Sequence, residues 1–297
     1  MYFKLNSVRE PIQIIEIFDS DRSDSFDLGH QFMTTQPETG YQAYVICTSP
    51  RSGSTLLCKL LAATGQAGDP RSYFHNADVG DWQRSLGLDE TSFANEKEQL
   101  TTVLETARNK GTAGSGIFGL RLQRKSFDYF VRQLAILCPG RETHSGRFEA
   151  VFGKTLFIHL TRSDKLAQAV SFVKASQTGL WHKAPDGTEL ERLAPPREPN
   201  YDAALIREHV DLMTAYDLAW ADWFKAENIM PLRITYDDLS REPETVIEET
   251  LVRIGRDPAH AKNIDLPVAR LSDGVNRAWI ERFRSETQSD PDITGQD

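Results

Sequence analysis

The sequence lacks long apolar segments. No run of about 18 or more apolar residues, the length that a helix needs to cross a membrane, occurs in its 297 residues. Near the N-terminus the short apolar runs are interrupted by the charges of Arg9, Glu10, Glu16 and Asp19, whereas the core of a secretory signal is uncharged. We therefore expect neither a transmembrane segment nor secretion.

Cysteine is also scarce. The three cysteines, Cys47, Cys58 and Cys138, are odd in number, and none occurs in a CxxC motif or at a spacing typical of metal ligands. We interpret them as small side chains in a reducing environment, with neither a disulfide framework nor a metal site. The expected location is therefore the cytoplasm.

Positive charge is in short supply as well. The sequence has 34 Lys and Arg against 43 Asp and Glu, which gives a formal net charge of -9 at pH 7. Nucleic-acid binding needs clustered Lys and Arg to neutralise phosphates, and this composition dilutes them. We expect no nucleic-acid partner, and any anionic ligand must be held by a local site.

The sequence does contain an alternation of strand and helix patterns. Short apolar segments rich in β-forming residues occur at residues 43–49, 116–122, 155–160 and 231–236. Helical periodicity follows them, which indicates an α/β fold with a mostly parallel central sheet and helices on both faces. Residues 139–150 are predicted to form a loop, and residues 182–200, rich in Pro, Gly and charge, a mobile insertion or lid.

The length and composition suit one folded domain. We place this domain at residues 43–286, after an N-terminal arm at residues 1–42 and before a flexible tail at residues 287–297. The arm is polar and irregular, and the tail has the polar composition of disordered segments. The oligomeric state stays open, with a homodimer among the alternatives.

The strongest local signal is the segment TSPRSGST, residues 48–55, between an apolar strand and the start of a helix. Small residues let backbone N–H groups approach an anion, the first amides of a helix carry partial positive charge, and Arg51 adds a full charge. An ordinary Ser/Gly turn has the same composition, so the segment alone leaves that alternative open. The candidate anion-binding residues are Arg51, Ser52, Gly53, Ser54 and Thr55.

A second candidate site is the segment TRSDKLAQAVS, residues 161–171, at the end of the clearest central strand. Ligands bind at the carboxyl ends of strands in a doubly wound sheet, so Arg162 should reach the same crevice as Arg51. Ser171 lies about two turns into the following helix and can face the same anion. The alternative is an exposed arginine and a serine on a helix surface.

The first loop is not a Walker motif. Nucleoside triphosphatases use GxxxxGK[ST], in which the Lys reaches the terminal phosphates and the hydroxyl binds magnesium, and no such string occurs in this sequence. This absence counts against a P-loop-type kinase, which we keep as an alternative.

Two segments carry a resemblance to a known family. YVICTSPRSGSTLLCKLLAATGQAGDP and FIHLTRSDKLAQAVSFVKASQTGLW resemble the motifs with which sulfotransferases bind 3'-phosphoadenosine 5'-phosphosulfate (PAPS), most closely those of the bacterial trehalose 2-sulfotransferase branch. Weaker similarity in GIFGLRL, ITYDDL and NRAWIERFR extends the match from about residue 44 to residue 284. The resemblance implies a P-loop-like, three-layer α/β sandwich that transfers a sulfuryl group from PAPS to a hydroxyl of a carbohydrate, such as trehalose or another glycan.

The resemblance also implies roles for individual residues. The loop from Arg51 to Thr55 would hold the 5'-phosphosulfate, and Arg162 and Ser171 would hold the 3'-phosphate of PAPS, which leaves as 3'-phosphoadenosine 5'-phosphate (PAP). Sulfuryl transfer requires stabilisation of this leaving phosphate without a bridging metal, and Arg51 with the loop amides can provide it. The residues placed near the acceptor are Arg121, Gln177 and Trp181.

One departure from the family concerns the general base. The trehalose branch has a glutamate two residues after the proline of GDPRSYFH, where this sequence has Ser72. The nearest replacements are Asp69 and His75, and His75 is favoured because an unperturbed pKa of about 6.5 leaves it mostly neutral near pH 7. The alternatives are that Asp69 only forms a turn and that His75 only packs. A catalytically inactive relative that binds a nucleotide or a sugar is the remaining alternative function.

Overall fold

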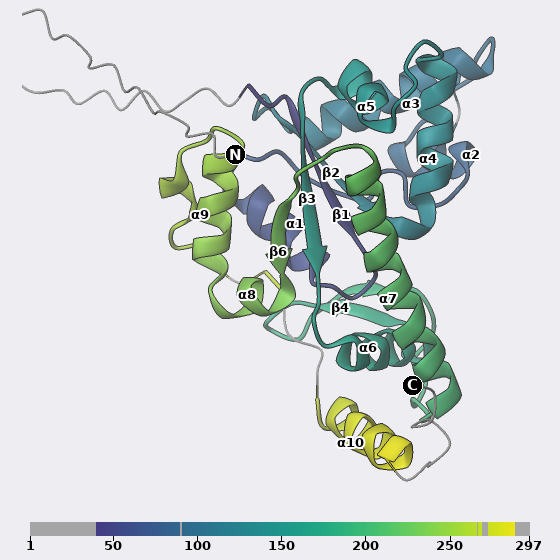
Figure 1. The fold of residues 1–297 in the computed structure, drawn as a ribbon, viewed down its shortest axis with the longest axis vertical. Helices are drawn as coiled ribbons and strands as arrows, with labels where there is room; N and C mark the ends of the chain where they lie inside the picture. Colours follow the sequence, from purple (N-terminus) through teal and green to yellow (C-terminus); the bar gives the residue numbers. More distant parts are fainter. Residues whose placement is uncertain (1–39, 90, 266, 269–272, 289–297) are drawn as a thin grey trace, which may run out of the picture. The chain divides into compact units, whose positions relative to one another are not determined.

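The computed structural model in Figure 1 describes residues 40–89, 91–265, 267–268 and 273–288. The expected N-terminal arm and flexible tail therefore lie outside the described residues, apart from a few residues next to the expected domain. None of the helices in these described ranges is long and apolar enough to span a membrane.

In the described part of the chain, the central sheet has four parallel strands in the order β2-β1-β3-β6. The strands are β1 (Ala43–Thr48), β2 (Phe118–Gln123), β3 (Thr155–Thr161) and β6 (Leu232–Thr235). Each overlaps a segment that was expected to form a strand. In the register of the sheet, Val45 of β1 lies between Leu120 of β2 and Phe157 of β3. The expected α/β fold with a parallel central sheet is confirmed.

Successive residues of β1 pack in two different cores, because neighbouring side chains of a strand point to opposite faces of the sheet. Val45 packs in a core rich in aromatic rings such as Phe130, and Ile46 packs in a second core with Leu60. The first core is covered by α2 (Val79–Leu86), α3 (Glu96–Thr112), α4 (Arg124–Leu137), α5 (His144–Phe152) and α7 (Ala203–Ala226). The second is covered by α1 (Ser54–Ala63), α9 (Pro243–Arg253) and the 3-10 helix η1 (Pro258–Ala261). Helices therefore cover both faces of the sheet (Figure 1).

Further elements gather beyond the carboxyl ends of the strands, where the anion-binding segments were expected. Figure 1 shows β4 and α6 beyond the arrowhead of β3. A third apolar cluster, with Val170, Ile206 and Trp279, joins α6 to α7 and α10. The elements at this end are α6 (Lys165–Thr178), β4 (Leu180–Lys183), β5 (Glu189–Arg192), α8 (Tyr236–Arg241) and α10 (Gly274–Gln288).

The prediction of a loop is confirmed for residues 139–143 and wrong for residues 144–150, because α5 begins at His144. The Thr143 hydroxyl caps this helix by accepting a hydrogen bond from an N–H group of its first turn at 3.1 Å. Glu227, distant in the sequence, accepts hydrogen bonds from two further N–H groups at 3.0 and 2.9 Å. Phe148 is fully buried in the first core. Tertiary contacts thus stabilise a helix that the local composition does not predict.

The segment at residues 182–200, which was expected to be a mobile insertion or lid, contains paired strands. β5 pairs antiparallel with β4, with a shift of register on each side of His182. Arg192 ties the hairpin to the end of α6, because its Nη1 donates to the carbonyl of Thr178 at 2.8 Å. The sequence of β5, Glu-Leu-Glu-Arg, is mostly exposed and therefore has no apolar signal of a strand.

Candidate active site

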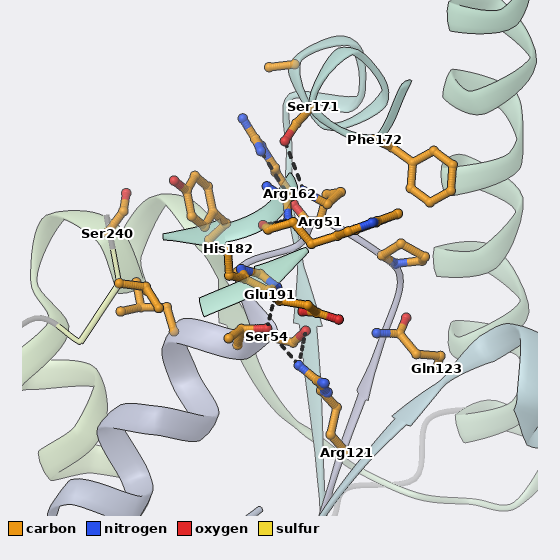
Figure 2. A pocket seen from close by; sticks show the side chains of 18 of the residues that line it. Arg51, Ser54, Arg121, Gln123, Arg162, Ser171, Phe172, His182, Glu191 and Ser240 are labelled. Atoms are coloured by element: carbon orange, nitrogen blue, oxygen red, sulfur yellow. Dashed lines mark hydrogen bonds and ion pairs between the residues drawn. The ribbon is translucent and has the colours of Figure 1, made fainter. Parts of the chain in front are cut away.

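The two segments expected to bind anions meet at one cavity. β1 and β3 are parallel neighbours, so their carboxyl ends deliver both segments to the same edge of the sheet. The cavity has a volume of about 450 Å³. Figure 2 shows side chains from both segments pointing into it, with Arg51 near its centre. Of the expected site residues, the cavity is lined by Arg51, Gly53, Ser54, Thr55, His75, Arg121, Arg162, Ser171 and Trp181.

The loop between β1 and α1 has a backbone that favours glycine at its last position. Gly53 has a φ of +88°, and a Cβ atom built on it would lie 2.5 Å from the ring of Tyr236. Gly53 is also the N-cap of α1, and no side chain makes a capping hydrogen bond there. The start of α1, at the positive end of the helix dipole, thus borders the cavity.

Hydrogen bonds hold this loop in place. Ser52 is fully buried, does not line the cavity and shares a hydrogen bond with the Thr48 hydroxyl. Gln168 of α6 donates to the hydroxyl of Ser49 at 3.0 Å and to the carbonyl of Pro50 at 2.7 Å. The side chain of Ser52 therefore supports the loop, and Gln168 is a buried support that the sequence analysis did not identify.

Arg51 connects the first segment to the second. Its Nε donates to the hydroxyl of Ser171 at 3.0 Å, and its Nη1 donates to the carbonyl of Trp181 at 2.7 Å. Arg162 donates to the carbonyl of Arg51 at 3.4 Å, and its guanidinium lies 4.6 Å from the centre of the Tyr236 ring. Both arginines and the serine thus surround the same space, as expected from strand order.

The two arginines make this space strongly positive. Burial, reinforced by repulsion from Arg162, lowers the pKa of Arg51 to about 10, and burial also lowers the pKa of Arg162. An arginine in a protein stays protonated at neutral pH, so two positive charges repel each other across the cavity. A bound anion would offset that repulsion, so the charge of the cavity suits an anionic ligand.

Arg121 extends from β2 to the side of the cavity next to α1. Its Nε donates to the hydroxyl of Ser72 at 2.7 Å, and its Nη1 donates to the hydroxyl of Thr55 at 2.9 Å. A longer contact of 3.5 Å joins Nη1 to the hydroxyl of Ser54 (Figure 2). The residue expected near the acceptor therefore lies directly beside the loop of residues 51–55, and it contacts Ser72.

The two candidate bases differ in position. His75 lines the cavity, where the ammonium of Lys125 lies 3.2 Å from its Nε2. Burial and the positive charges of Lys125 and Arg121 lower the pKa of His75 to about 4, so its ring is neutral at pH 7. Asp69 does not line the cavity, and its carboxylate forms a 2.7 Å ion pair with Arg71.

The two remaining expected residues, Trp181 and Gln177, also differ in position. Trp181 lines the cavity, and its ring lies 5.9 Å from the guanidinium of Arg51. Gln177 does not line it. The amide of Gln177 donates to the carbonyl of Asn200 at 3.0 Å and accepts from the same residue's N–H at 2.8 Å. Gln177 therefore fastens the segment after β5 to α6.

The lining residues that the sequence analysis missed include Gln123, Lys125, His182 and Glu191. His182 directly follows Trp181. Glu191 lies beside it because β5 pairs with β4, and no apolar pattern in the sequence predicts this pairing. Among the residues that the structure describes, no group of three or more His, Cys, Asp or Glu side chains is arranged to hold a metal ion.

The chain is similar to known proteins. Two trehalose 2-sulfotransferases are similar to this chain: that of Mycolicibacterium smegmatis is 30% identical over 84% of this chain and 96% of its own length. That of Mycobacterium tuberculosis is 29% identical over 82% of this chain and 94% of its own length. A solved sulfotransferase domain from the Synechococcus PCC 7002 olefin synthase is 17% identical, with a TM-score of 0.36, over 82% of this chain and 86% of that one.

A family model matches a segment of the chain that includes every residue lining the cavity. The model described as "Stf0 sulphotransferase" matches residues 43–286, which include the loop after β1 and the segment after β3. The expectation of a sulfotransferase from the two sequence motifs is therefore confirmed. The chain belongs to the Stf0 sulfotransferase family.

Proposed function

We propose that this protein transfers the sulfuryl group of PAPS to a hydroxyl of a carbohydrate, trehalose or another glycan, and releases PAP. One observation carries the proposal: Arg51 and Arg162, 111 residues apart, are joined by a hydrogen bond and line one cavity with Ser171. The names of both curated relatives contain trehalose, which supports a carbohydrate acceptor.

The donor is proposed to lie across the two segments. The loop of residues 51–55 would hold the 5'-phosphosulfate with the N–H groups of the turn and of the start of α1. Arg51 would stabilise the charge that develops on the leaving phosphate. Arg162 and Ser171 would hold the 3'-phosphate, for which a guanidinium and a hydroxyl are suitable donors. Ser52 would contribute its backbone, since its hydroxyl bonds to Thr48.

The acceptor is proposed to lie between Arg121 and the β4–β5 hairpin. Arg121 contacts the loop hydroxyls of Ser54 and Thr55 and can donate to an acceptor oxygen beside the sulfate. Trp181 offers an aromatic face, on which the apolar face of a sugar ring can pack. Gln177 would act indirectly, by holding the segment at Asn200 against α6.

Of the two candidate bases from the sequence, His75 is better placed than Asp69. His75 lines the cavity with a neutral ring, whereas Asp69 lies outside the lining and is paired with Arg71. We further propose that the protein works in the cytoplasm, which its three free cysteines support. A homodimer stays a prediction.

The test combines ligand binding with a transfer assay. Calorimetry should give tight binding of PAP without magnesium and much weaker binding of ADP with magnesium. Mass spectrometry with labelled PAPS and a panel of trehalose, other glycans and small alcohols should show a product heavier by one sulfate. Phosphate transfer from ATP would support a kinase instead, and PAP binding without any transfer would support an inactive relative.

A further inference from the structure

The β4–β5 hairpin brings a histidine and a carboxylate to the anion-binding loop. Nε2 of His182 lies 3.0 Å from the Thr55 hydroxyl and 3.4 Å from the Glu191 carboxylate. Both hairpin residues line the cavity, and Figure 2 shows them beside Ser54 and Arg51. Among the described residues that line the cavity, Glu191 is the only carboxylate. A proton acceptor and a negative charge therefore lie next to the place proposed for the sulfate.

The hydrogen bonds around Thr55 are compatible with a proton-accepting Nε2 on His182. A guanidinium has only donors, so Arg121 donates to the Thr55 oxygen at 2.9 Å. The hydroxyl keeps its single hydrogen, which it can donate to Nε2 of His182. In the tautomer with its hydrogen on Nδ1, His182 accepts the Thr55 hydrogen at Nε2, over 3.0 Å and beside the loop. An acceptor hydroxyl at that position would meet the same lone pair.

The charges around His182 come from four elements of the fold. Burial, then the positive charges of Arg51, Arg121 and Lys59, lower the pKa of His182 to about 3, so the ring is neutral at pH 7. A bound anionic donor offsets the arginine charges and makes the ring a stronger base. Glu191, from β5, faces the same nitrogen and stabilises the imidazolium that forms when Nε2 takes up a proton.

We infer that His182 is the general base of the proposed sulfuryl transfer and that Glu191 is its positioning residue. The acceptor oxygen forms a bond to sulfur while the bond between sulfur and the bridging oxygen of PAPS breaks. The proton of the acceptor hydroxyl moves to Nε2 of His182, and PAP leaves with the electron pair of the broken bond. This inference rests on the proposed function.

The hydrogen-bond geometry at His75 favours His182 for this role, although burial and the nearby cations hold the pKa of His182, about 3, below that of His75, about 4. The ammonium of Lys125 has only donors and lies 3.2 Å from Nε2 of His75, so it occupies that lone pair. A proton added to His75 would place a second positive charge beside Lys125. A proton added to His182 would meet Glu191 instead. The two histidines line one cavity but differ in the sign of the nearest charge.

The experiment compares His182→Gln and Glu191→Gln with His260→Gln, a change in an exposed histidine of η1 outside the cavity. The substrates are PAPS and trehalose, or the glycan that the wild type sulfates fastest in the acceptor panel. We expect kcat to fall about 10²-fold or more in His182→Gln, as for loss of a general base, with the Kd for PAP changed less than about threefold. Added imidazole should partly restore turnover in His182→Ala.

Glu191→Gln gives a second readout that a purely structural role would not produce. Without the carboxylate the imidazolium is less stable, so the acidic limb of the kcat profile should move to lower pH. We expect kcat to fall about tenfold in this variant, with PAP affinity unchanged. His260→Gln should match the wild type in kcat, in the Kd for PAP and in the pH profile of kcat.

Three outcomes would overturn the assignment of the base while leaving the proposed function intact. They are wild-type kcat in His182→Gln, a larger loss of kcat in His75→Gln than in His182→Gln, and a loss of PAP affinity in His182→Gln equal to its loss of kcat. Absence of sulfate transfer by the wild type to every acceptor tested would instead overturn the proposed function, and the inference with it.

Discussion

The loop after β1 and the β4–β5 hairpin line the same cavity but are built in different ways. The loop is closely packed: Thr48, Ser49 and Ser52 are fully buried and hydrogen bonded. The hairpin is open, with the Glu191 side chain 46% exposed. The proposed donor side is therefore fixed by the core of the domain, and the proposed acceptor side is carried on an exposed extension. Substitutions in the two regions should then affect different parameters.

The largest effect is expected from the arginines that join the two segments. Arg51→Ala and Arg162→Ala each remove one of the two buried charges, so the Kd for PAP should rise about 100-fold. Calorimetry with PAP measures this, and Arg132→Ala on α4, an exposed arginine, is the matched control. Unchanged affinity in both variants would show that the donor does not bind between the segments.

Gly53→Ala should be the next most damaging change on the donor side. A φ of +88° is strained for alanine, and the new Cβ would lie 2.5 Å from the Tyr236 ring. We expect a rise of about tenfold in the Kd for PAP and a loss of about 1–3 kcal/mol in the free energy of unfolding.

Gly65→Ala is the matched control for this change. Gly65 has a φ of +66°, with nothing within 4 Å of the added Cβ, so it carries the strain without the clash. Chemical denaturation should show a loss of about 1 kcal/mol with no change in PAP binding. Equal PAP binding in Gly53→Ala and wild type would mean that the shape of the loop is not needed for the donor.

On the hairpin side, acidification should destabilise the fold through His182. Its pKa is lowered from 6.5 to about 3, so the unfolded chain binds more protons than the folded chain between these values. The free energy of unfolding therefore falls as pH falls from about 6.5, by at most about 1.4 kcal/mol per pH unit for this group. Urea denaturation at several pH values should give a shallower dependence in His182→Gln and an unchanged one in His260→Gln. An identical dependence in His182→Gln and wild type would contradict the burial of a neutral ring.

The smallest effect is expected from Gln177→Ala, at the base of the hairpin. It removes two hydrogen bonds to Asn200, which fasten the segment after β5 to α6. We expect KM for the carbohydrate acceptor to rise a few-fold, since one such bond contributes about 1 kcal/mol, with the Kd for PAP unchanged. Steady-state kinetics and calorimetry separate the two, and a change in PAP affinity alone would place Gln177 on the donor side instead.

The contrast between the loop and the hairpin also explains which site residues could be predicted from the sequence. The residues of the proposed donor side lie in segments that are continuous in the sequence. A buried strand, small loop residues and a helix start identify the loop of Arg51 without knowledge of distant contacts. Arg162 could be placed beside it because parallel strands end at one edge of a sheet. The position of Ser171 followed from helix periodicity, and its hydroxyl meets Arg51.

The acceptor side depends on pairings that no local pattern records. Glu191 reaches His182 only because β5 folds back on β4 with an irregular register. The carboxylate of Asp69 pairs with Arg71, two residues away, rather than facing the cavity. The helix at His144 likewise depends on Glu227, which lies 83 residues further along the chain. For Glu191 and for this helix the deciding contact is tertiary, whereas the ion pair of Asp69 is local.

The bonds from Gln168 to Ser49 and Pro50 also bear on the thermodynamics of ligand capture. A loop that is already immobilised loses little conformational entropy when an anion arrives, so most of the interaction energy remains available as affinity. A free loop would have to lose roughly 1–2 kcal/mol of backbone entropy for each residue that it orders. The polypeptide therefore loses this entropy once, when it folds, and binding of the proposed nucleotide donor would begin from a loop that is already ordered.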